Sequence, residues 1–184
     1  MVIPASIPAT CITRSAPSRS SRRSVCGVDF PVDDFALTPA ERALIDALNK
    51  RGVRFLLLGL GAALLEGAAV ATQDLDVWFE DAHDERIRQS AQDAGGFWIP
   101  GFGLQPPAFG GAGLDRVDVV LTAHGLDPFA VEYERSLTRE VDGVTLRSLP
   151  LERIIASKRA TNRPKDRAGL PALEAALAAR NARE

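Results

Sequence analysis

Apolar and polar positions near the start of the folded region follow a helical period. Between Thr38 and Gly52, apolar residues recur at spacings of about three or four, which predicts an amphipathic helix. Thr38, followed by Pro39 and Glu41, is typical of a helix start, because the threonine side chain caps the first turn and the glutamate returns a hydrogen bond. Gly52 is typical of a helix end.

After this helix, short apolar runs alternate with amphipathic segments. Strands are predicted over residues 53–59, 74–80, 96–100 and 116–122. Helices are predicted over residues 62–68, 83–96 and 127–136. The alternation indicates an α/β (α+β) chain with a mixed sheet flanked by helices.

The last third of the chain predicts a hairpin and two helices. Residues 139–149 read as two strands joined by the tight turn Asp142-Gly143. Helices over residues 150–162 and 163–183 then form a C-terminal helical appendage, and we expect Pro171 to divide the second. Residues 100–114 hold five glycines and three prolines and are expected to form a loop, either one that closes over a substrate or one without a role of its own.

Composition narrows the class of protein. Apolar residues make up 46% of the 184 residues and charged residues 25%, as in a soluble globular domain. The net charge of −2 argues against a protein that coats nucleic acid. Cys11 and Cys26 stand alone, so neither a zinc site nor a disulfide framework is expected. Glycines and Glu66 interrupt the longest apolar run, so we expect no membrane partner and a cytoplasmic protein.

The first residues differ from the rest in composition. Residues 1–29 are rich in arginine and serine and carry no acid before Asp29, which is typical either of an organelle transit peptide or of a disordered leader ahead of the folded chain. We expect a leader over residues 1–29, a main domain over 30–149 and the helical appendage over 150–184.

Carboxylates at predicted strand ends are the first candidate chemistry. Asp74 and Asp76 stand two apart and therefore share one face of a strand, where they repel each other. Asp118 stands in a later predicted strand and can join them if the strands are neighbours. Oxygen ligands of this kind suit Mg²⁺ or Mn²⁺, and a bound cation relieves the repulsion. The plain alternative is a solvated strand edge.

Glycines and basic residues are candidates for binding phosphate. Gly59 and Gly61 lie between a predicted strand and helix, where backbone N–H groups can bind an anion, or where glycine only permits a tight turn. Lys158, Arg163 and Lys165 are clustered near the C-terminus and can contact phosphate or nucleic acid, or form a solvated basic face. Asp166 is expected to pair with one of them or to cap the last helix.

Together these motifs resemble the polymerase-β-like nucleotidyltransferase superfamily. Its pattern is hG[GS], about nine to thirteen residues, Dh[DE]h and a later h[DE]h. The matching segments here are 58–60 (LGL), 74–77 (DLDV) after thirteen intervening positions, and 117–119 (VDV). The tail "LPLERIIASKRATNRPKD" is similar to that of small bacterial minimal nucleotidyltransferases, including relatives of abortive-infection and toxin–antitoxin enzymes. The resemblance covers roughly residues 40–178.

The resemblance implies a nucleotidyltransferase-like fold and a metal-dependent transfer of a nucleoside monophosphate from a triphosphate to a hydroxyl. It implies that Asp74 and Asp76 bind metal and that Asp118 completes the site and helps to activate the hydroxyl. The acceptor stays open between a protein, a tRNA end and a small molecule. Leu60 stands where the family has its second glycine or serine, and Val70 stands where many small relatives have a basic residue.

A second class of function is a degenerate member of the same family without activity. Such a protein would use the scaffold to bind a partner, for example a small helical protein as the other half of a toxin–antitoxin pair. Retention of all three acids favours the enzyme, whereas Leu60 and Val70 favour the degenerate form.

Overall fold

The computed structural model describes residues 35–111 and 113–183, so the predicted leader and both cysteines lie outside the described residues. Its helices are α1 (Pro39–Lys50), α2 (Gly59–Leu65), α3 (Glu85–Asp93), α4 (Phe129–Arg135), α5 (Leu151–Thr161) and α6 (Pro164–Asn181). Its strands are β1 (Phe55–Leu58), β2 (Leu75–Phe79), β3 (Phe97–Ile99), β4 (Ala108–Gly110), β5 (Val117–Val120), β6 (Leu137–Val141) and β7 (Val144–Ser148).

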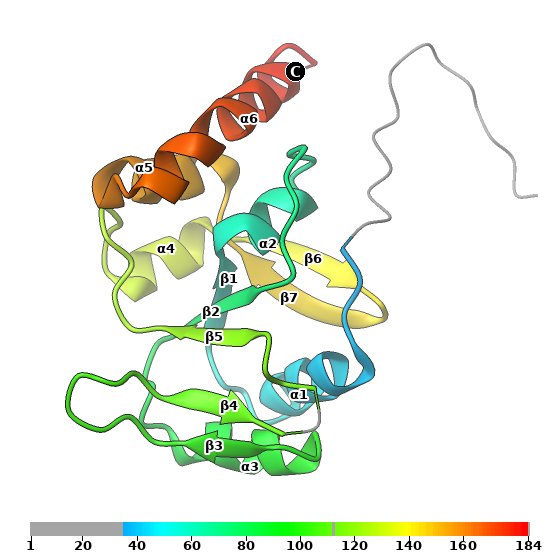
Figure 1. The fold of residues 1–184 in the computed structure, drawn as a ribbon. Helices are drawn as coiled ribbons and strands as arrows, with labels where there is room; N and C mark the ends of the chain where they lie inside the picture. Colours follow the sequence, from blue (N-terminus) through cyan, green and yellow to red (C-terminus); the bar gives the residue numbers. More distant parts are fainter. Residues whose placement is uncertain (1–34, 112, 184) are drawn as a thin grey trace, which may run out of the picture.

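The main sheet has five strands in the order β5-β2-β1-β7-β6 (Figure 1). Strand β1 runs antiparallel to β2 and parallel to β7, while β2 runs parallel to β5 and β6 antiparallel to β7. Strands β3 and β4 form a separate antiparallel pair. The predicted α/β fold with a mixed sheet flanked by helices is therefore confirmed.

Helices cover the sheet in two groups (Figure 1). Helix α1 packs against α3 and β7, and α3 packs against β3. Helix α2 contacts β1, β2 and α5, and α5 packs along α6. Buried apolar side chains from both groups join one core with the strands, among them Leu44, Leu56, Ile87, Ile154 and Leu173. In the described residues, none of the helices is both long enough and apolar enough to span a membrane.

At two places the structure contains the local motif that the sequence predicts. Thr38 and Glu41 close a reciprocal capping box at the start of α1. Asp142 and Gly143 both have positive φ, at 50° and 78°, as a two-residue hairpin turn between β6 and β7 requires.

Tertiary packing overrides the local signals elsewhere. Pro171 does not divide the last helix but lies inside α6. The proline costs about 3 kcal/mol, but α6 buries Leu173 completely in the core and packs Leu170 against it. Within the expected loop over residues 100–114, Ala108–Gly110 forms β4, because Phe109 is buried and packs against Trp98.

Aromatic side chains attach the small sheet to the main one. Phe79 of β2 meets the rings of Trp98 and Phe109 at centroid distances of 6.2 Å each. The rings of Trp98 and Phe109 lie 4.8 Å apart, edge to face. This cluster holds the base of the β3–β4 pair against β2, and β4 also contacts β5.

A buried carboxylate connects α2 to the end of the last helix. The Glu66 side chain is 2% exposed and accepts hydrogen bonds from Arg139 Nε of β6 at 3.1 Å and from Arg180 Nη1 of α6 at 3.1 Å. Arg180 also pairs with Glu152 of α5, whereas Glu66 is the carboxylate that joins Arg139 and Arg180, so it links the end of α2 to both β6 and α6.

We expect Glu66→Ala to lower the free energy of unfolding by roughly 2–3 kcal/mol, because it removes the carboxylate partner of Arg139 and one of the two carboxylate partners of Arg180. Chemical denaturation measures the change. Glu174→Ala is the matched control, since its pair with Arg159 is exposed and should contribute under about 0.5 kcal/mol. Equal effects of the two substitutions would contradict the role of Glu66.

Candidate functional site

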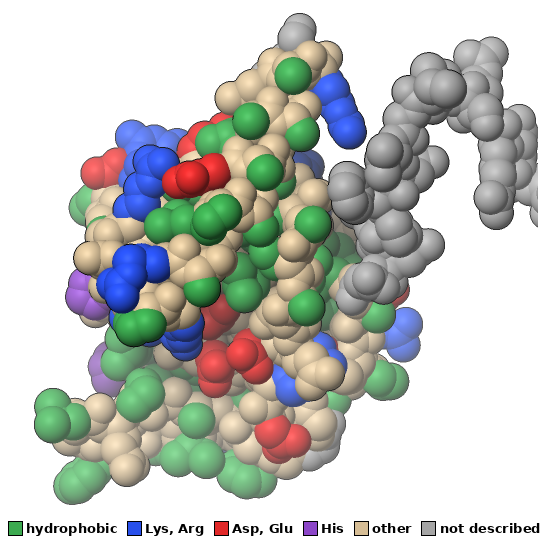
Figure 2. All heavy atoms as spheres, turned by 45° about the horizontal axis from the view of Figure 1, so that its top comes forward, with side chains coloured by type: hydrophobic (Ala, Val, Ile, Leu, Met, Phe, Trp, Pro, Cys, Tyr) green, Lys and Arg blue, Asp and Glu red, His purple; other side chains and the backbone are tan. Residues whose placement is uncertain are grey.

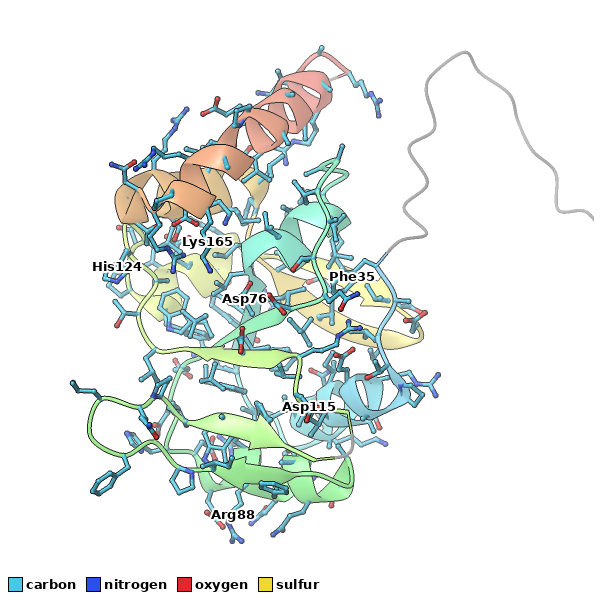
Figure 3. The ribbon with its side chains drawn as sticks, in the orientation of Figure 1. Phe35, Asp76, Arg88, Asp115, His124 and Lys165 are labelled. Carbon is cyan, nitrogen blue, oxygen red and sulfur yellow. The ribbon has the colours of Figure 1, made fainter. Side chains whose placement is uncertain are left out.

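The sheet brings the predicted carboxylates together at one end of neighbouring strands. Asp76 of β2 lies opposite Leu58 of β1 on one side and opposite Asp118 of β5 on the other. Asp74 immediately precedes β2, two residues from Asp76, and is exposed. Figure 3 shows Asp76 at this end of the sheet, below α2.

Gly59 is required by the close approach of Asp76. Its φ is +70°, and a Cβ added there would lie 1.9 Å from Asp76 Oδ2. The residue therefore leaves room for the carboxylate and also starts α2 directly after β1, with no separate glycine turn between them. Gly61 is buried and does not line the cleft: its added Cβ would lie 3.2 Å from the Phe35 ring and 3.4 Å from the carbonyl oxygen of Asp74. Its predicted contact with phosphates stays a prediction.

A cleft of about 580 Å³ opens above the three carboxylates. One wall is the sheet end, with Gly59, Leu60, Asp74, Asp76 and Asp118. A second wall is the α5–α6 corner, which contributes Ser157, Lys158, Thr161, Arg163, Lys165 and Asp166. A third wall consists of residues 106–108 and 122–124. Figure 2 shows acidic side chains (red) beside basic ones (blue) in the middle of this face.

Asp166 organises the basic wall. Its side chain is fully buried and accepts hydrogen bonds from Arg163 Nε at 2.6 Å, Thr161 Oγ1 at 2.9 Å and Lys158 Nζ at 3.2 Å. Burial alone would raise the pKa of this carboxyl, but the hydrogen bonds outweigh it and hold the pKa well below its usual range. Asp166 therefore pairs with its neighbours as expected from the sequence, and it fixes Lys158 and Arg163 at the rim of the cleft.

Lys165 differs from these two basic residues. It is exposed, it lines the cleft, and no ion pair within the described residues involves it. In Figure 3 its side chain lies above Asp76, between the sheet and the last two helices. Lys165 is thus placed to meet an anion that enters the cleft.

The charge of Asp76 is poorly compensated. Burial, then the charge of Asp118 and that of Asp74, raise the pKa of Asp76 to about 6, although Lys158 and Lys165 oppose the shift. In the described part of the chain, none of these three aspartates forms an ion pair. Their mutual repulsion is the cost that a bound cation would remove.

The three aspartates do not form a preformed metal cluster. No group of three or more His, Cys, Asp or Glu side chains in residues 35–111 and 113–183 is arranged to hold an ion. The donor chemistry nevertheless fits Mg²⁺ or Mn²⁺, because the available atoms are carboxylate oxygens and such ions keep water and substrate phosphate among their ligands. Asp74 and Asp118 are both exposed and can turn toward an ion that also binds Asp76.

Several hydroxyl groups of the cleft were not singled out from the sequence. Hydroxyl groups of Thr72, Thr122, Ser157 and Thr161 line it, and His124 lies at its exposed edge (Figure 3). Ser157 and Thr161 stand four apart on α5, so their hydroxyl groups lie on one face of the helix, and Lys158 is next to Ser157 in the chain. This spacing is the signal by which the two hydroxyl groups could have been found from the sequence. No local pattern marks the two threonines outside the helix.

Comparison with solved structures identifies the architecture. The crystal structure of ANT(2")-Ia in complex with adenylyl-2"-tobramycin matches with a TM-score of 0.52 and 15% identity, over 76% of this chain and 88% of that chain. A solution structure of the antibiotic-resistance factor ANT(2'')-Ia matches with a TM-score of 0.48 and 16% identity, over 78% of this chain and 90% of that one. An antigenic nucleotidyltransferase-like protein from Paracoccidioides brasiliensis gives 0.47 and 14%, over 77% of this chain and 75% of that one.

No family model matches the chain, and neither does any curated protein. The first of these structural likenesses confirms the predicted nucleotidyltransferase-like fold. The closer similarity to small bacterial minimal and abortive-infection enzymes stays a prediction.

We expect Gly59→Ala to lower the free energy of unfolding by about 2–4 kcal/mol, because it combines strain at positive φ with a clash against Asp76. Gly67→Ala is the control: its φ is +81° but nothing lies within 4 Å of the added Cβ, so strain alone should cost about 1–2 kcal/mol. Urea denaturation compares them. Asp76→Ala should recover part of the loss in the Gly59 variant only; equal losses at the two glycines would refute the contact.

Proposed function

We propose that this chain is a metal-dependent nucleotidyltransferase that transfers a nucleoside monophosphate from a nucleoside triphosphate to a hydroxyl group. The observation that carries the proposal is the cleft itself. Three carboxylates without cationic partners in the described residues, one with its pKa raised to about 6, face a wall that presents Lys158, Arg163 and Lys165. The nucleotidyltransferase-like fold supports the same activity.

Asp74, Asp76 and Asp118 would hold Mg²⁺ or Mn²⁺ at the end of the sheet. When bound, the ion supplies positive charge that offsets the repulsion of the aspartates and of the triphosphate. Asp76 is the fixed ligand, because Gly59 and the neighbouring strands confine it. Asp74, two residues before it, and Asp118, on the neighbouring strand, would supply the other carboxylate oxygens.

The α5–α6 corner would bind the phosphates of the donor. Lys165 meets the triphosphate directly, and Lys158 and Arg163 are held at the same rim by Asp166. Because the buried Asp166 carboxylate already restricts these two long side chains, they lose less conformational entropy when they bind phosphate. Negative charge on the donor is therefore met from the side opposite the aspartates.

The transfer is an in-line displacement at the α-phosphorus. The acceptor oxygen forms a bond to the α-phosphorus while the bond from that phosphorus to the bridging oxygen of the β-phosphate breaks, and pyrophosphate leaves. Asp118, exposed to the cleft on the edge strand β5, accepts a hydrogen bond from the acceptor hydroxyl, whose proton passes to solvent. Positioning and electrostatic stabilisation supply most of the rate.

A second candidate function is supported by Leu60. Its side chain lines the cleft beside Gly59, at the position where the family pattern has glycine or serine. If Leu60 blocks the triphosphate, the chain is a degenerate, non-catalytic member of the fold that binds a protein partner, as in one half of a toxin–antitoxin pair.

We expect one nucleoside triphosphate to stabilise the wild-type protein when Mg²⁺ is present and to have no effect in a chelator. At about 100 times its dissociation constant the ligand adds roughly 2.7 kcal/mol, or about 5–10 °C in the unfolding midpoint. Thermal unfolding with each common triphosphate measures the shift. Asp76→Asn should abolish it.

Asp115→Asn is the matched control, because Asp115 is an exposed aspartate three residues before Asp118 that lies near α1 and does not line the cleft, and it should keep the full shift (Figure 3). A shift that survives in Asp76→Asn would contradict the proposed metal site. Binding by Leu60→Ser but not by wild type would establish the degenerate alternative.

A further inference from the structure

The turn that joins β3 and β4 holds apolar side chains out in solvent. Phe102 and Gln105 exchange two backbone hydrogen bonds, of 3.1 and 3.0 Å, so the backbone of the turn is ordered. Phe102 is 88% exposed and Leu104 is fully exposed. A tight turn that presents a phenylalanine and a leucine to water is unusual unless another molecule covers them.

The chain that follows this turn borders the cleft. Directly after the turn, Pro106 and Pro107 line the wall of the cleft that faces β5. Ile99 of β3 and Leu121, just past the end of β5, are also about half exposed. We name Ile99, Phe102, Leu104 and Leu121 the tip patch; Figure 2 shows apolar side chains (green) projecting from this end of the molecule, at lower left.

The tip patch lies on the acceptor side of the proposed reaction. Strand β5, which carries Asp118, is the edge of the main sheet, and β4 packs next to it. The basic α5–α6 corner forms a different wall of the cleft. Because Pro106 and Pro107 line the cleft directly after the turn, a molecule that packs on the tip patch can extend into the cleft away from the basic corner.

The charge of this surface limits what the acceptor can be. Residues 94–114 contain no charged side chain, so the tip patch offers no cation to the phosphates of an RNA. The proposed metal site uses the carboxylates of Asp74, Asp76 and Asp118. The buried Asp166 carboxylate already accepts hydrogen bonds from three side chains. Among residues 35–111 and 113–183, no further carboxylate lines the cleft to bind the ammonium groups of a polycationic small molecule.

We propose that the acceptor is a serine, threonine or tyrosine hydroxyl of a protein, presented by a segment whose apolar residues pack on the tip patch. The inference rests on the proposed function and names its acceptor. The acceptor side-chain oxygen becomes bonded to the α-phosphorus, pyrophosphate leaves, and the hydroxyl proton passes to solvent. Large, rigid, exposed apolar side chains are typical anchors of protein–protein contacts.

The test uses the full chain, Mg²⁺ and the stabilising triphosphate labelled at its α-phosphate. The acceptors are casein, which exposes apolar residues together with serine and threonine hydroxyls, total tRNA, and tobramycin. The proteins are wild type, Asp76→Asn, and Phe102→Ser combined with Leu104→Ser. Val131→Ser on α4 is the matched control, since Val131 is also an exposed apolar residue but lies outside the tip patch and does not adjoin Pro106 and Pro107 in the chain.

We expect label in casein that depends on Asp76 and falls at least about tenfold in the Phe102/Leu104 variant. That variant should keep the thermal shift with Mg²⁺ and triphosphate, and Val131→Ser should label casein like wild type. Label in tRNA or tobramycin instead, or casein labelling that the tip variant leaves unchanged, overturns the inference while the proposed function stands.

Donor binding without label in casein also overturns the inference. A loss of the thermal shift in the tip variant would mean that the tip contacts the donor, which overturns it too. Absence of the thermal shift in wild type instead contradicts the proposed function itself, so the two failures are distinguishable.

Discussion

The confinement of one carboxylate, that of Asp76, is the constraint on which the rest of the site depends. Its oxygen occupies the space that a side chain at residue 59 would fill, and its strand neighbour across the sheet is another aspartate. Burial and like charge together raise its pKa to about 6. A fold that keeps this arrangement retains a local source of instability, and a cation bound from the cleft is the direct means of relieving it.

The remaining parts of the cleft are arranged around that point. Asp166 gathers the cations of the α5–α6 corner on one side, while the side toward β5 and the β3–β4 turn is uncharged. Each wall has its own anchor in the fold. Asp166 holds the basic wall together, Glu66 joins α2 to the C-terminal end of α6, and the aromatic cluster around Phe79 places the β3–β4 pair. The two substrates of a transfer reaction would thus meet surfaces of different charge that are held by separate parts of the core.

Much of the fold could be predicted because local chemistry and global packing agree there. The capping box of α1, the Asp142-Gly143 turn and the alternation of strands all carry their signal within a few residues. Pro171 and β4 were not predicted correctly, because burial of Leu173 and Phe109 against distant segments decides both. Such packing is not visible in a local pattern.

For the site, strand periodicity placed Asp74 and Asp76 together and offered Asp118 on the condition that its strand is a neighbour; the pairing of β2 with β5 meets that condition. The reason for Gly59 was not visible, since it depends on the antiparallel register of β1 and β2. From the sequence, Asp166 was expected to pair with one basic residue or to cap the last helix; in the structure it holds both Lys158 and Arg163, across the angle between two helices.

Carboxyl-carbon NMR of Asp76 tests the central claim most directly. In a chelator, its titration should have a midpoint near pH 6, above that of an ordinary aspartate, as the confined carboxylate requires. Saturating Mg²⁺ should lower this midpoint by at least about one unit, because the cation stabilises the charged form. An identical titration with and without Mg²⁺ would show that no cation binds Asp76, and would contradict the account of this cleft as a metal-dependent site.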